Sequence, residues 1–365
     1  MTGKLRVAVI GAGIARRHLT GYGWNKERFE VPVLCSLDED RGLALCKEYG
    51  IPEYTQDTDS LFGRDDIDVI DICTPPYNHN QLAKRAVAAG KHVICEKPLF
   101  GSVAEVDDMI ETVGRTNLKF MPIFQYRYGT GLQKLRRLVE LGLTGKPLMT
   151  TIETHWWRDA DYYAAVDWRG KWATELGGGL LGHAIHAHDM LNYVHGQCAE
   201  VFAYGNALLN DIEVEDTMVL AVKMANGSLA SLSMTLGSRE EISRLRFCFE
   251  NVTVESIRAP YTMGRDPWVF TAGDKEHQQK VDAALSGVPT TEDGYTRQFE
   301  LFYEAIAEDG QPPVTLQDAR TALELVTAAY HSQRSGRPAA LPIASNHPLY
   351  RSWLPESELR KAANA

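Results

Sequence analysis

Two segments of the chain carry side chains that can accept or donate a proton near neutral pH. Lys97 directly follows a short apolar run, and residues 177–189 open with three consecutive glycines and contain His183 and His186. An imidazole, or an amine whose partial burial favours its neutral form, can take the proton of a hydroxyl group. These residue types favour acid–base chemistry on an alcohol.

A glycine turn near the N-terminus is a candidate cofactor site. The apolar run 5–10 leads directly into the turn, and a helix is expected to follow it. In this arrangement the backbone can approach a pyrophosphate, whose charge is stabilised by the amide groups at the helix N-terminus. The third glycine position of the usual motif holds Arg16. The turn predicts dinucleotide contacts from Gly11, Gly13, Ile14 and Ala15.

Polar residues also follow the next apolar runs. The runs 29–37, 67–73 and 91–95 alternate with a helix-like stretch, 80–89, that stops at Gly90. Strands that alternate with helices imply a parallel sheet, and such sheets bind ligands beyond the carboxyl ends of their strands. We expect further cofactor contacts there, from Ser36, Asp38, Arg41, Thr74, Pro75, His79, Glu96 and Lys97.

The composition restricts the class of protein. At 365 residues the chain exceeds what one hydrophobic core usually serves, so two domains are expected. A net charge of −10 disfavours nucleic acid, and no apolar run approaches the roughly 18 to 20 residues that span a bilayer. The N-terminus enters a strand-like run at once, without the apolar region of a signal peptide. Six scattered cysteines favour a reducing compartment, the cytoplasm, and no metal site.

An aromatic and basic stretch lies upstream of the three glycines, from residue 155 to residue 172. Flat rings cover the C–H faces of carbohydrate-like ligands, while Arg, Asp and Tyr side chains hydrogen-bond their hydroxyl groups. Some of the tryptophans are expected to be structural instead. The candidate substrate contacts are Arg158, Tyr163 and Trp172. Arg127 is either a further contact or one member of an ion pair at a domain interface.

Together these features resemble the glucose–fructose oxidoreductase, inositol dehydrogenase and rhizopine catabolism (Gfo/Idh/MocA) family. The resemblance covers residues 4–343. Its Glu-Lys-Pro triplet, residues 96–98, is the most specific part and the glycine turn is the least specific. The segments that carry it are the glycine turn ending in His18, the loop 73–79, the segment 90–98 and the stretch 177–189.

The resemblance implies an α/β fold with an N-terminal Rossmann dinucleotide-binding domain, residues 1–123. An α/β domain with a large, open, mostly antiparallel sheet follows at residues 124–343, and residues 344–365 form a C-terminal tail. Family members commonly pack a late helix, here expected at residues 315–332, on the first domain. Extended segments of the second domain are expected at residues 148–155, 199–207, 217–223, 228–236 and 245–250.

The resemblance also assigns the catalytic residues. It implies that Lys97 contacts the substrate hydroxyl and assists proton transfer, and that His186 is the proton acceptor. Many members have an aspartate four residues before this histidine, where the present chain has Gly182. His183, beside the missing carboxylate, would share a helical face with His186 and either contacts substrate or packs. A metal bound by His183, His186 and Asp189 is possible by residue type, but the family chemistry needs none.

The cofactor is expected to be NAD or NADP. Where NAD-preferring relatives have an aspartate the chain has Ser36, followed by Arg41, which resembles NADP-using members. Three nearby acids, including Asp38 and Asp40, tilt the expectation slightly toward NAD, because they would repel a 2′-phosphate.

The resemblance implies an NAD(P)-dependent oxidoreductase, a homodimer or homotetramer. It would transfer a hydride between nicotinamide and a secondary carbinol of a sugar, cyclitol or glycoside. One alternative is a redox-assisted enzyme that retains its cofactor while it cleaves a glycoside or rearranges a sugar. Another is a nucleotide-responsive regulator without enzymatic activity.

Overall fold

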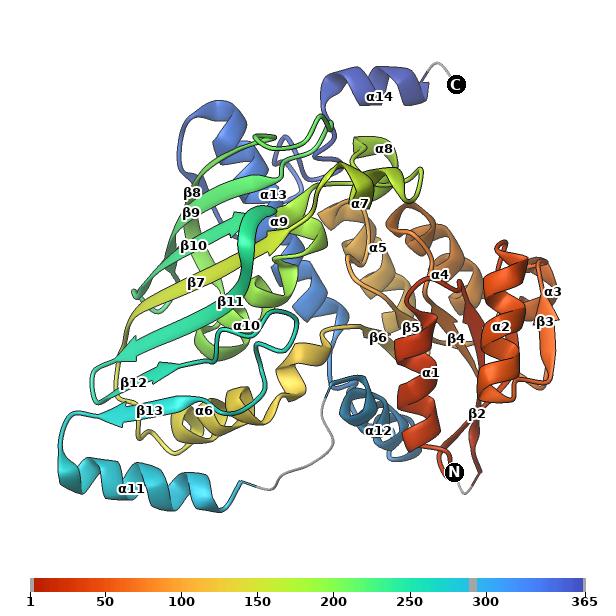
Figure 1. Cartoon of the computed structure of the whole chain (residues 1–365). Helices are drawn as coiled ribbons and strands as arrows, with labels where there is room; N and C mark the ends of the chain where they lie inside the picture. Colours follow the sequence, from red (N-terminus) through yellow and green to blue (C-terminus); the bar gives the residue numbers. More distant parts are fainter. Residues whose placement is uncertain (1–2, 289–293, 364–365) are drawn as a thin grey trace. The chain divides into compact units, whose positions relative to one another are not determined.

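The computed structural model describes residues 3–288 and 294–363, and the chain divides into two compact units. Unit 1 comprises Met1–Gly101, Glu105–Gln125 and Gly294–Ala319. Unit 2 comprises Ser102–Ala104, Tyr126–Asp293 and Arg320–Ala365. Each unit contains one sheet (Figure 1).

Unit 1 is built on a six-stranded sheet in which every pair of neighbouring strands is parallel. The order β3-β2-β1-β4-β5-β6 means that the chain changes side of the sheet between β3 and β4. The carboxyl ends of β1 and β4 therefore flank the switch point, where open parallel sheets bind their ligands. The strands are β1 (Leu5–Ile10), β2 (Phe29–Cys35), β3 (Glu53–Thr55), β4 (Val69–Ile72), β5 (His92–Cys95) and β6 (Phe120–Pro122).

Short-range signals set the ends of the helices between these strands. The carboxylate of Asp38 accepts the N–H of Arg41 at 3.0 Å and caps one helix, which ends at Gly50 with φ 69°. Gly90, with φ 74°, follows the end of another. The helices are α1 (Ala15–Trp24), α2 (Glu39–Tyr49), α3 (Asp59–Phe62), η1 (Pro76–Asn78), α4 (His79–Ala88) and α5 (Val103–Gly114).

A helix from late in the chain completes unit 1. Helix α12 (Gly294–Ala307) lies beside α1 (Figure 1). The ring of Phe299 stacks on that of Tyr22 with centroids 4.5 Å apart, which buries aromatic surface between the two helices. The helix expected at residues 315–332 is α13 (Leu316–Ser335), of which only the part up to Ala319 belongs to unit 1.

Unit 2 contains an eight-stranded sheet of order β13-β12-β11-β7-β10-β9-β8-β14. Every pair is antiparallel except β7 and β10, which are parallel, so the sheet is mostly antiparallel, as expected. The strands are β7 (Pro147–Trp157), β8 (Cys198–Asn206), β9 (Thr217–Met224), β10 (Leu229–Thr235), β11 (Gly237–Phe249), β12 (Val252–Glu255), β13 (Val269–Ala272) and β14 (Ala339–Ala340).

The two faces of this sheet differ. On β9 buried and exposed residues alternate, so that Leu220 and Val222 point into the core and Val219 points to the open face. Helix α9 (Gly179–Gly182) packs on β9 and β10, and α10 (Ile185–His195) packs on β7. The remaining helices are η2 (Gln125–Tyr128), α6 (Thr130–Glu140), α7 (Ala160–Ala164), α8 (Trp172–Glu175), α11 (Lys275–Ser286) and α14 (Glu356–Ala363).

The strands expected in the second domain agree with β7 to β10 within a few residues, whereas β11 starts at Gly237 rather than at residue 245. The short strands β12 and β13 and the helix α11 were not predicted. All six cysteines are free, and five of them are buried. Within the described parts of the chain, no helix combines the length and apolar character needed to cross a membrane.

Candidate active site

The glycine turn of unit 1 fits a dinucleotide pyrophosphate. Gly11 has φ 103°, and a methyl group placed on it would lie 2.6 Å from the carbonyl oxygen of Cys73, so only glycine is tolerated. A methyl group on Gly13 would meet no described atom within 4 Å, which leaves its backbone open to a ligand. The N-cap residue of α1, Ile14, makes no side-chain cap, so the first amide groups of α1 remain available to an anion.

The loop after β2 places the predicted ribose contacts near one another. Ser36 is buried, and its hydroxyl oxygen accepts the N–H of Asp38 at 3.1 Å. One carboxylate oxygen of Asp38 is used by the cap of α2, whose first turn also holds Glu39 and Asp40. Arg41 is exposed. The loop is therefore acidic at the place where an adenosine ribose would lie.

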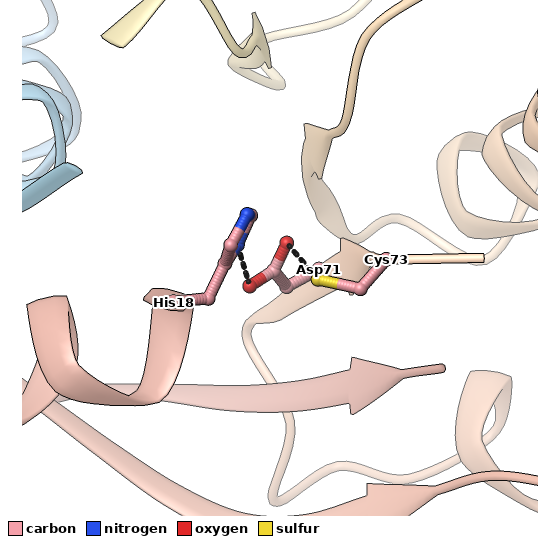
Figure 2. A group of neighbouring side chains, drawn as sticks. All are labelled: His18, Asp71 and Cys73. Carbon is pink, nitrogen blue, oxygen red and sulfur yellow. Dashed lines mark hydrogen bonds and ion pairs between the residues drawn. The ribbon is translucent and has the colours of Figure 1, made fainter. Parts of the chain in front are cut away.

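A buried polar network joins α1 to β4 and to the residue after β5, and Figure 2 shows two of its members, His18 and Asp71, with the neighbouring Cys73. His18 of α1 points its Nδ1 at Asp71 Oδ2 of β4, 2.8 Å away, and its Nε2 at Glu96 Oε1, 3.0 Å away. A neutral imidazole has one N–H, so an imidazole that faces a carboxylate on both sides is best described as a cation. His18 and Asp71 are fully buried.

The pKa shifts agree with this description. Burial opposes the charged form of His18, but the carboxylate of Asp71 raises its pKa well above the ordinary value. Burial also opposes the ionised form of Glu96, but the hydrogen bond and charge of His18 lower its pKa to about 2. The hydroxyl groups of Tyr22 and Tyr295 donate to Asp71 and Glu96, both at 2.7 Å. The network is an imidazolium held between two carboxylates.

The same corner brings a nitrogen of His18, an oxygen of Asp71 and the sulfur of Cys73 within 4.8 Å of one another, a spacing that a metal ion could use. Both ring nitrogens of His18 are already hydrogen-bonded, however, and burial raises the pKa of Cys73 to about 12, which keeps it a thiol. Protons rather than a metal account for this cluster.

Glu96 connects the network to Lys97. Its second oxygen, Oε2, accepts the backbone N–H of Lys97 at 2.9 Å. Because the first oxygen is held by His18, the backbone at Lys97 is fixed at the carboxyl end of β5. The backbone that carries the side chain of Lys97 is therefore fixed at the ligand-binding edge of the sheet.

The predicted contacts after β4 divide into two kinds. The hydroxyl oxygen of Thr74 is buried and has no hydrogen-bond partner among the described residues, which fits a ligand at the switch point. His79 is buried with Nδ1 2.9 Å from the carbonyl oxygen of Pro98 and Nε2 2.8 Å from that of Thr74. Its ring thus joins the loops after β4 and β5. Pro75 precedes η1.

In unit 2 a buried carboxylate holds the three-glycine segment. Glu215 accepts the N–H groups of Gly178 at 3.2 Å and Leu180 at 3.0 Å, and the hydroxyl of Tyr330 at 3.1 Å. A methyl group on Gly178 would lie 2.0 Å from the carbonyl oxygen of Glu215, so the segment packs as closely as glycine allows. Burial raises the pKa of Glu215 to about 7 despite these donors. The hydrogen bonds from Gly178 and Leu180 to Glu215 therefore fix the start of α9.

His183 and His186 follow this segment but do not share a helix. Helix α9 ends at Gly182 and α10 begins at Ile185, so the expectation of a common helical face is wrong: the helix breaks between them. Both histidines are buried. The Nε2 atom of His183 lies 3.2 Å from the hydroxyl of Tyr162, and the ring of His186 packs on Tyr126 with centroids 4.4 Å apart.

An aromatic and charged cluster surrounds His183. Trp156 meets its ring edge-on at 5.6 Å, and the guanidinium of Arg169 lies 3.9 Å above the ring of Tyr162. Arg158 donates to Glu241 and to the hydroxyl of Tyr261, both at 2.8 Å. Tyr163 packs edge-on against Tyr162 at 5.2 Å. The cluster combines ring faces with polar groups, as a carbohydrate-like ligand requires.

Two predicted substrate contacts are bound to other parts of unit 2. The buried guanidinium of Arg127 forms a two-pronged ion pair with Asp189, at 2.7 and 2.5 Å. The ring of Trp172 packs edge-on against Tyr330 at 5.4 Å, and the backbone N–H of Trp172 donates to Glu213 Oε2 at 2.9 Å. Arg127 is thus the member of an ion pair, as one reading of the sequence allowed, although the pair lies within unit 2. Sequence reasoning did not select Tyr162, His18 or Asp71 as site residues, and it expected Glu96 as a cofactor contact rather than as a member of a buried network. A charge inside the apolar run of β4 was the available signal for Asp71.

This fold and this turn define a Rossmann-type dinucleotide-binding enzyme. Residues 5–124 match the oxidoreductase family with an NAD-binding Rossmann fold, and residues 132–255 match the GFO/IDH/MocA C-terminal domain. The chain therefore belongs to the GFO/IDH/MocA family of oxidoreductases.

Individual relatives match the chain over most of its length. The chain is 26% identical over 359 residues to a myo-inositol 2-dehydrogenase of Thermotoga maritima. This alignment covers 92% of the present chain and 98% of that dehydrogenase. The chain is 25% identical over 363 residues to a levoglucosan dehydrogenase of Pseudarthrobacter phenanthrenivorans, covering 86% and 92%. The fold is shared with the WlbA dehydrogenase of Chromobacterium violaceum, solved with NADH and UDP-GlcNAcA, at a TM-score of 0.82 and 24% identity over 94% and 97% of the two chains.

The buried network generates a prediction for stability. Glu96→Gln removes one carboxylate from a buried cation, and breaking such a pair costs about 3–5 kcal/mol. We expect the free energy of unfolding at neutral pH to fall by about this amount, measured by denaturant titration. Glu48→Gln, which breaks the exposed pair with Arg16, is the matched control and should cost at most about 1 kcal/mol.

The pH dependence has a defined sign. The folded-state pKa of Glu96 lies below its ordinary value, so its stabilisation is complete above that ordinary value and is lost as the pH falls toward about 2. The difference in the free energy of unfolding between wild type and Glu96→Gln should therefore become smaller as the pH falls. A difference that stayed constant across this range would contradict the assignment.

Proposed function

We propose that the protein is a cytoplasmic NAD-dependent dehydrogenase that oxidises a secondary carbinol of a sugar, cyclitol or glycoside. The fixed backbone of Lys97 carries this proposal. Its N–H is held by a carboxylate that a buried imidazolium holds in turn, at the ligand-binding edge of a parallel sheet. The six free cysteines favour a reducing compartment.

The residues of the glycine turn fit the cofactor, and amide groups at the start of α1 would hold its pyrophosphate. The nicotinamide of a bound cofactor would supply the hydride-accepting chemistry. Lys97 contacts the substrate hydroxyl and assists removal of its proton. His186 is the proton acceptor, and the groups around His183 orient the substrate.

We assign the preference for NAD to the acidic loop after β2. Asp38, Glu39 and Asp40 stand within three positions of one another, and Ser36 is buried. A 2′-phosphate would meet this negative charge, which the exposed Arg41 of the same loop offsets in part. The ribose diol of NAD carries no such charge.

The substrate class follows from the cluster in unit 2 and from the relatives. Trp156, Tyr162 and Tyr163 offer ring surfaces, and Arg158 offers a guanidinium that its partners hold in place. The named relatives act on myo-inositol and levoglucosan. These ligands share secondary hydroxyl groups on an apolar ring framework, which suits such a cluster.

The direct experiment is turnover of myo-inositol, levoglucosan and methyl β-D-glucoside with NAD and with NADP, followed by the absorbance of the reduced nicotinamide. We expect oxidation of at least one polyol, faster with NAD. Lys97→Ala should lower kcat about 100-fold or more while NADH affinity, measured by fluorescence, is unchanged. Lys97→Arg is the matched control: it keeps the charge but does not release a proton, so it should fail as well.

Several results would contradict this proposal. If Lys97→Arg had wild-type turnover, Lys97 would contribute its positive charge and not a proton transfer. Equal loss of NADH binding in Lys97→Ala would mean that Lys97 supports the structure or the nucleotide site instead of proton transfer. Turnover of no polyol by a protein that binds NADH would favour a regulator, and a cofactor retained through purification without net reduction would favour redox-assisted glycoside cleavage.

The open face of the unit 2 sheet supports the further proposal of a homodimer or homotetramer. Tyr204 and Val219 are cross-strand neighbours, 65% and 48% exposed, and Leu229 and Met149 form a second exposed pair. An apolar sheet face of this kind is usually covered by a partner. The double change Tyr204→Lys with Val219→Lys should shift the protein to monomers in sedimentation equilibrium. Trp24→Lys, at an exposed apolar residue of unit 1, should not.

A further inference from the structure

Leu176 has an unfavourable backbone conformation just before the three glycines. It is the C-cap residue of α8, and its φ of 68° and ψ of −6° place it in the left-handed region. Helices often end in this conformation, but usually at a glycine, because a Cβ atom makes it unfavourable. Here the glycines begin one position later, at Gly177. A contact from elsewhere in the fold is therefore needed to hold the backbone at Leu176.

That contact comes from the segment that follows β14. The indole N–H of Trp353 donates to the carbonyl oxygen of Leu176 at 2.6 Å. Trp353 is fully buried, and both residues belong to unit 2. The direction of a carbonyl group depends on the ψ angle of its own residue, so a donor in a fixed place favours one backbone conformation there.

Helix α13 supports the same stretch of chain. The ring of Tyr330 lies beside that of Trp353, with centroids 6.4 Å apart. Its hydroxyl accepts the N–H of Gly178 at 3.3 Å and donates to Glu215 at 3.1 Å. A methyl group on Gly177 would lie 2.5 Å from this hydroxyl. The start of the three-glycine segment is thus held by Glu215, Tyr330 and Trp353, which come from three different parts of the sequence.

The three-glycine segment needs such support. Glycine has more conformational freedom than any other residue, so three in a row give the backbone little preference of its own. The residues proposed to accept the proton and to orient the substrate, His186 and His183, follow this segment. A displacement of about 1 Å in a catalytic group can cost much of the rate. A change of direction at Leu176 would pass through the glycines to these histidines.

We infer that Trp353 is a positioning residue of the proposed substrate site. Its indole N–H holds Leu176 in the left-handed conformation and so sets the direction in which the chain enters the three glycines. The effect on turnover rests on the proposed function, whereas the effect on the backbone does not. The segment after β14 thereby supports the site through one buried side chain.

Kinetics with the polyol of the panel that wild type oxidises fastest test the role in turnover. Trp353→Phe keeps an aromatic ring but loses the N–H, and should lower kcat about 10-fold at unchanged NADH affinity. In a Leu176→Gly background the same change should lower kcat at most about 3-fold, because glycine adopts a positive φ without help from the hydrogen bond.

Trp268→Phe is the matched control. Trp268 is also buried in unit 2, and its indole N–H donates to the carbonyl oxygen of Met263 at 3.1 Å. The change removes the same donor and the same ring volume at a different backbone carbonyl. It should leave kcat within about 2-fold of its value in each background, because no hydrogen bond to Leu176 is lost.

Hydrogen exchange tests the effect on the backbone without any ligand. The N–H groups of Gly178 and Leu180 donate to Glu215, and peptides spanning residues 176–182 of the full chain report their exchange by mass spectrometry. Exchange should be about 10-fold faster in Trp353→Phe, but at most about 3-fold faster when Leu176→Gly is already present. Trp268→Phe should exchange like wild type in these peptides.

A second variant decides the question if Trp353→Phe does not fold. Benzothienylalanine at position 353 has a ring of the same size in which sulfur replaces the N–H, so it removes the donor without leaving a cavity. The same changes in kcat and in exchange are expected of it.

The outcomes separate the two proposals. A wild-type protein that turns over nothing on the panel contradicts the proposed function, while hydrogen exchange still decides whether Trp353 holds the segment. An active wild type with unchanged kcat or unchanged exchange in Trp353→Phe overturns the inference alone. A loss that Leu176→Gly does not reduce, or that Trp268→Phe shares, also overturns it, because Trp353 would then contribute packing and not the conformation of Leu176.

Discussion

The hydrogen-bonded imidazolium of His18 is the interaction on which the ligand-binding edge of unit 1 depends. It connects helix α1, strand β4 through Asp71 and the end of β5 through Glu96, and Tyr295 of α12 closes the network. Three elements that meet only by folding are joined by charge-assisted hydrogen bonds in a buried place, where such bonds are strong. The glycine turn and the backbone of Lys97 are the two ends of this connection.

In unit 2 a buried carboxylate also accepts backbone N–H groups, but its pKa is shifted in the opposite direction from that of Glu96. Glu215 holds the three-glycine segment through two amide groups and the hydroxyl of Tyr330. Burial raises the pKa of Glu215 to about 7, whereas the hydrogen bond and charge of His18 lower the pKa of Glu96. In both units a buried carboxylate fixes the backbone just before the residues proposed for proton transfer. The backbone next to the candidate catalytic groups is thus held by hydrogen bonds to buried carboxylates.

The sequence predicted the parts of the fold that depend on local pattern. Apolar runs separated by turns located β1, β2, β4 and β5, and the fold class was correct. Pairings between distant segments were not predictable: α12 joins α1 from about 270 residues away, and β7 lies parallel to β10. Such contacts depend on tertiary burial, which a single sequence does not encode by periodicity. The same reason explains why the sequence left two interpretations of Arg127 open, since its partner Asp189 is 62 residues away.

The site shows the same division. The glycine turn and the Glu-Lys-Pro triplet were recognisable because each is a short continuous motif. The role of Asp71, in contrast, follows only from its hydrogen bonds with His18 and Tyr22, which lie far away in the sequence. His183 and His186 looked like neighbours on one helix because their spacing of three is helical. The break after Gly182 removes that relation.

The protonation state of His18 tests the central claim most directly. Its ring signals can be followed by NMR during a pH titration of the wild-type protein and assigned by comparison with His18→Asn. With carboxylates on both ring nitrogens, the imidazole should remain doubly protonated in mildly alkaline solution, where an ordinary histidine is neutral. A titration with an ordinary midpoint, or a single neutral tautomer throughout, would contradict the account.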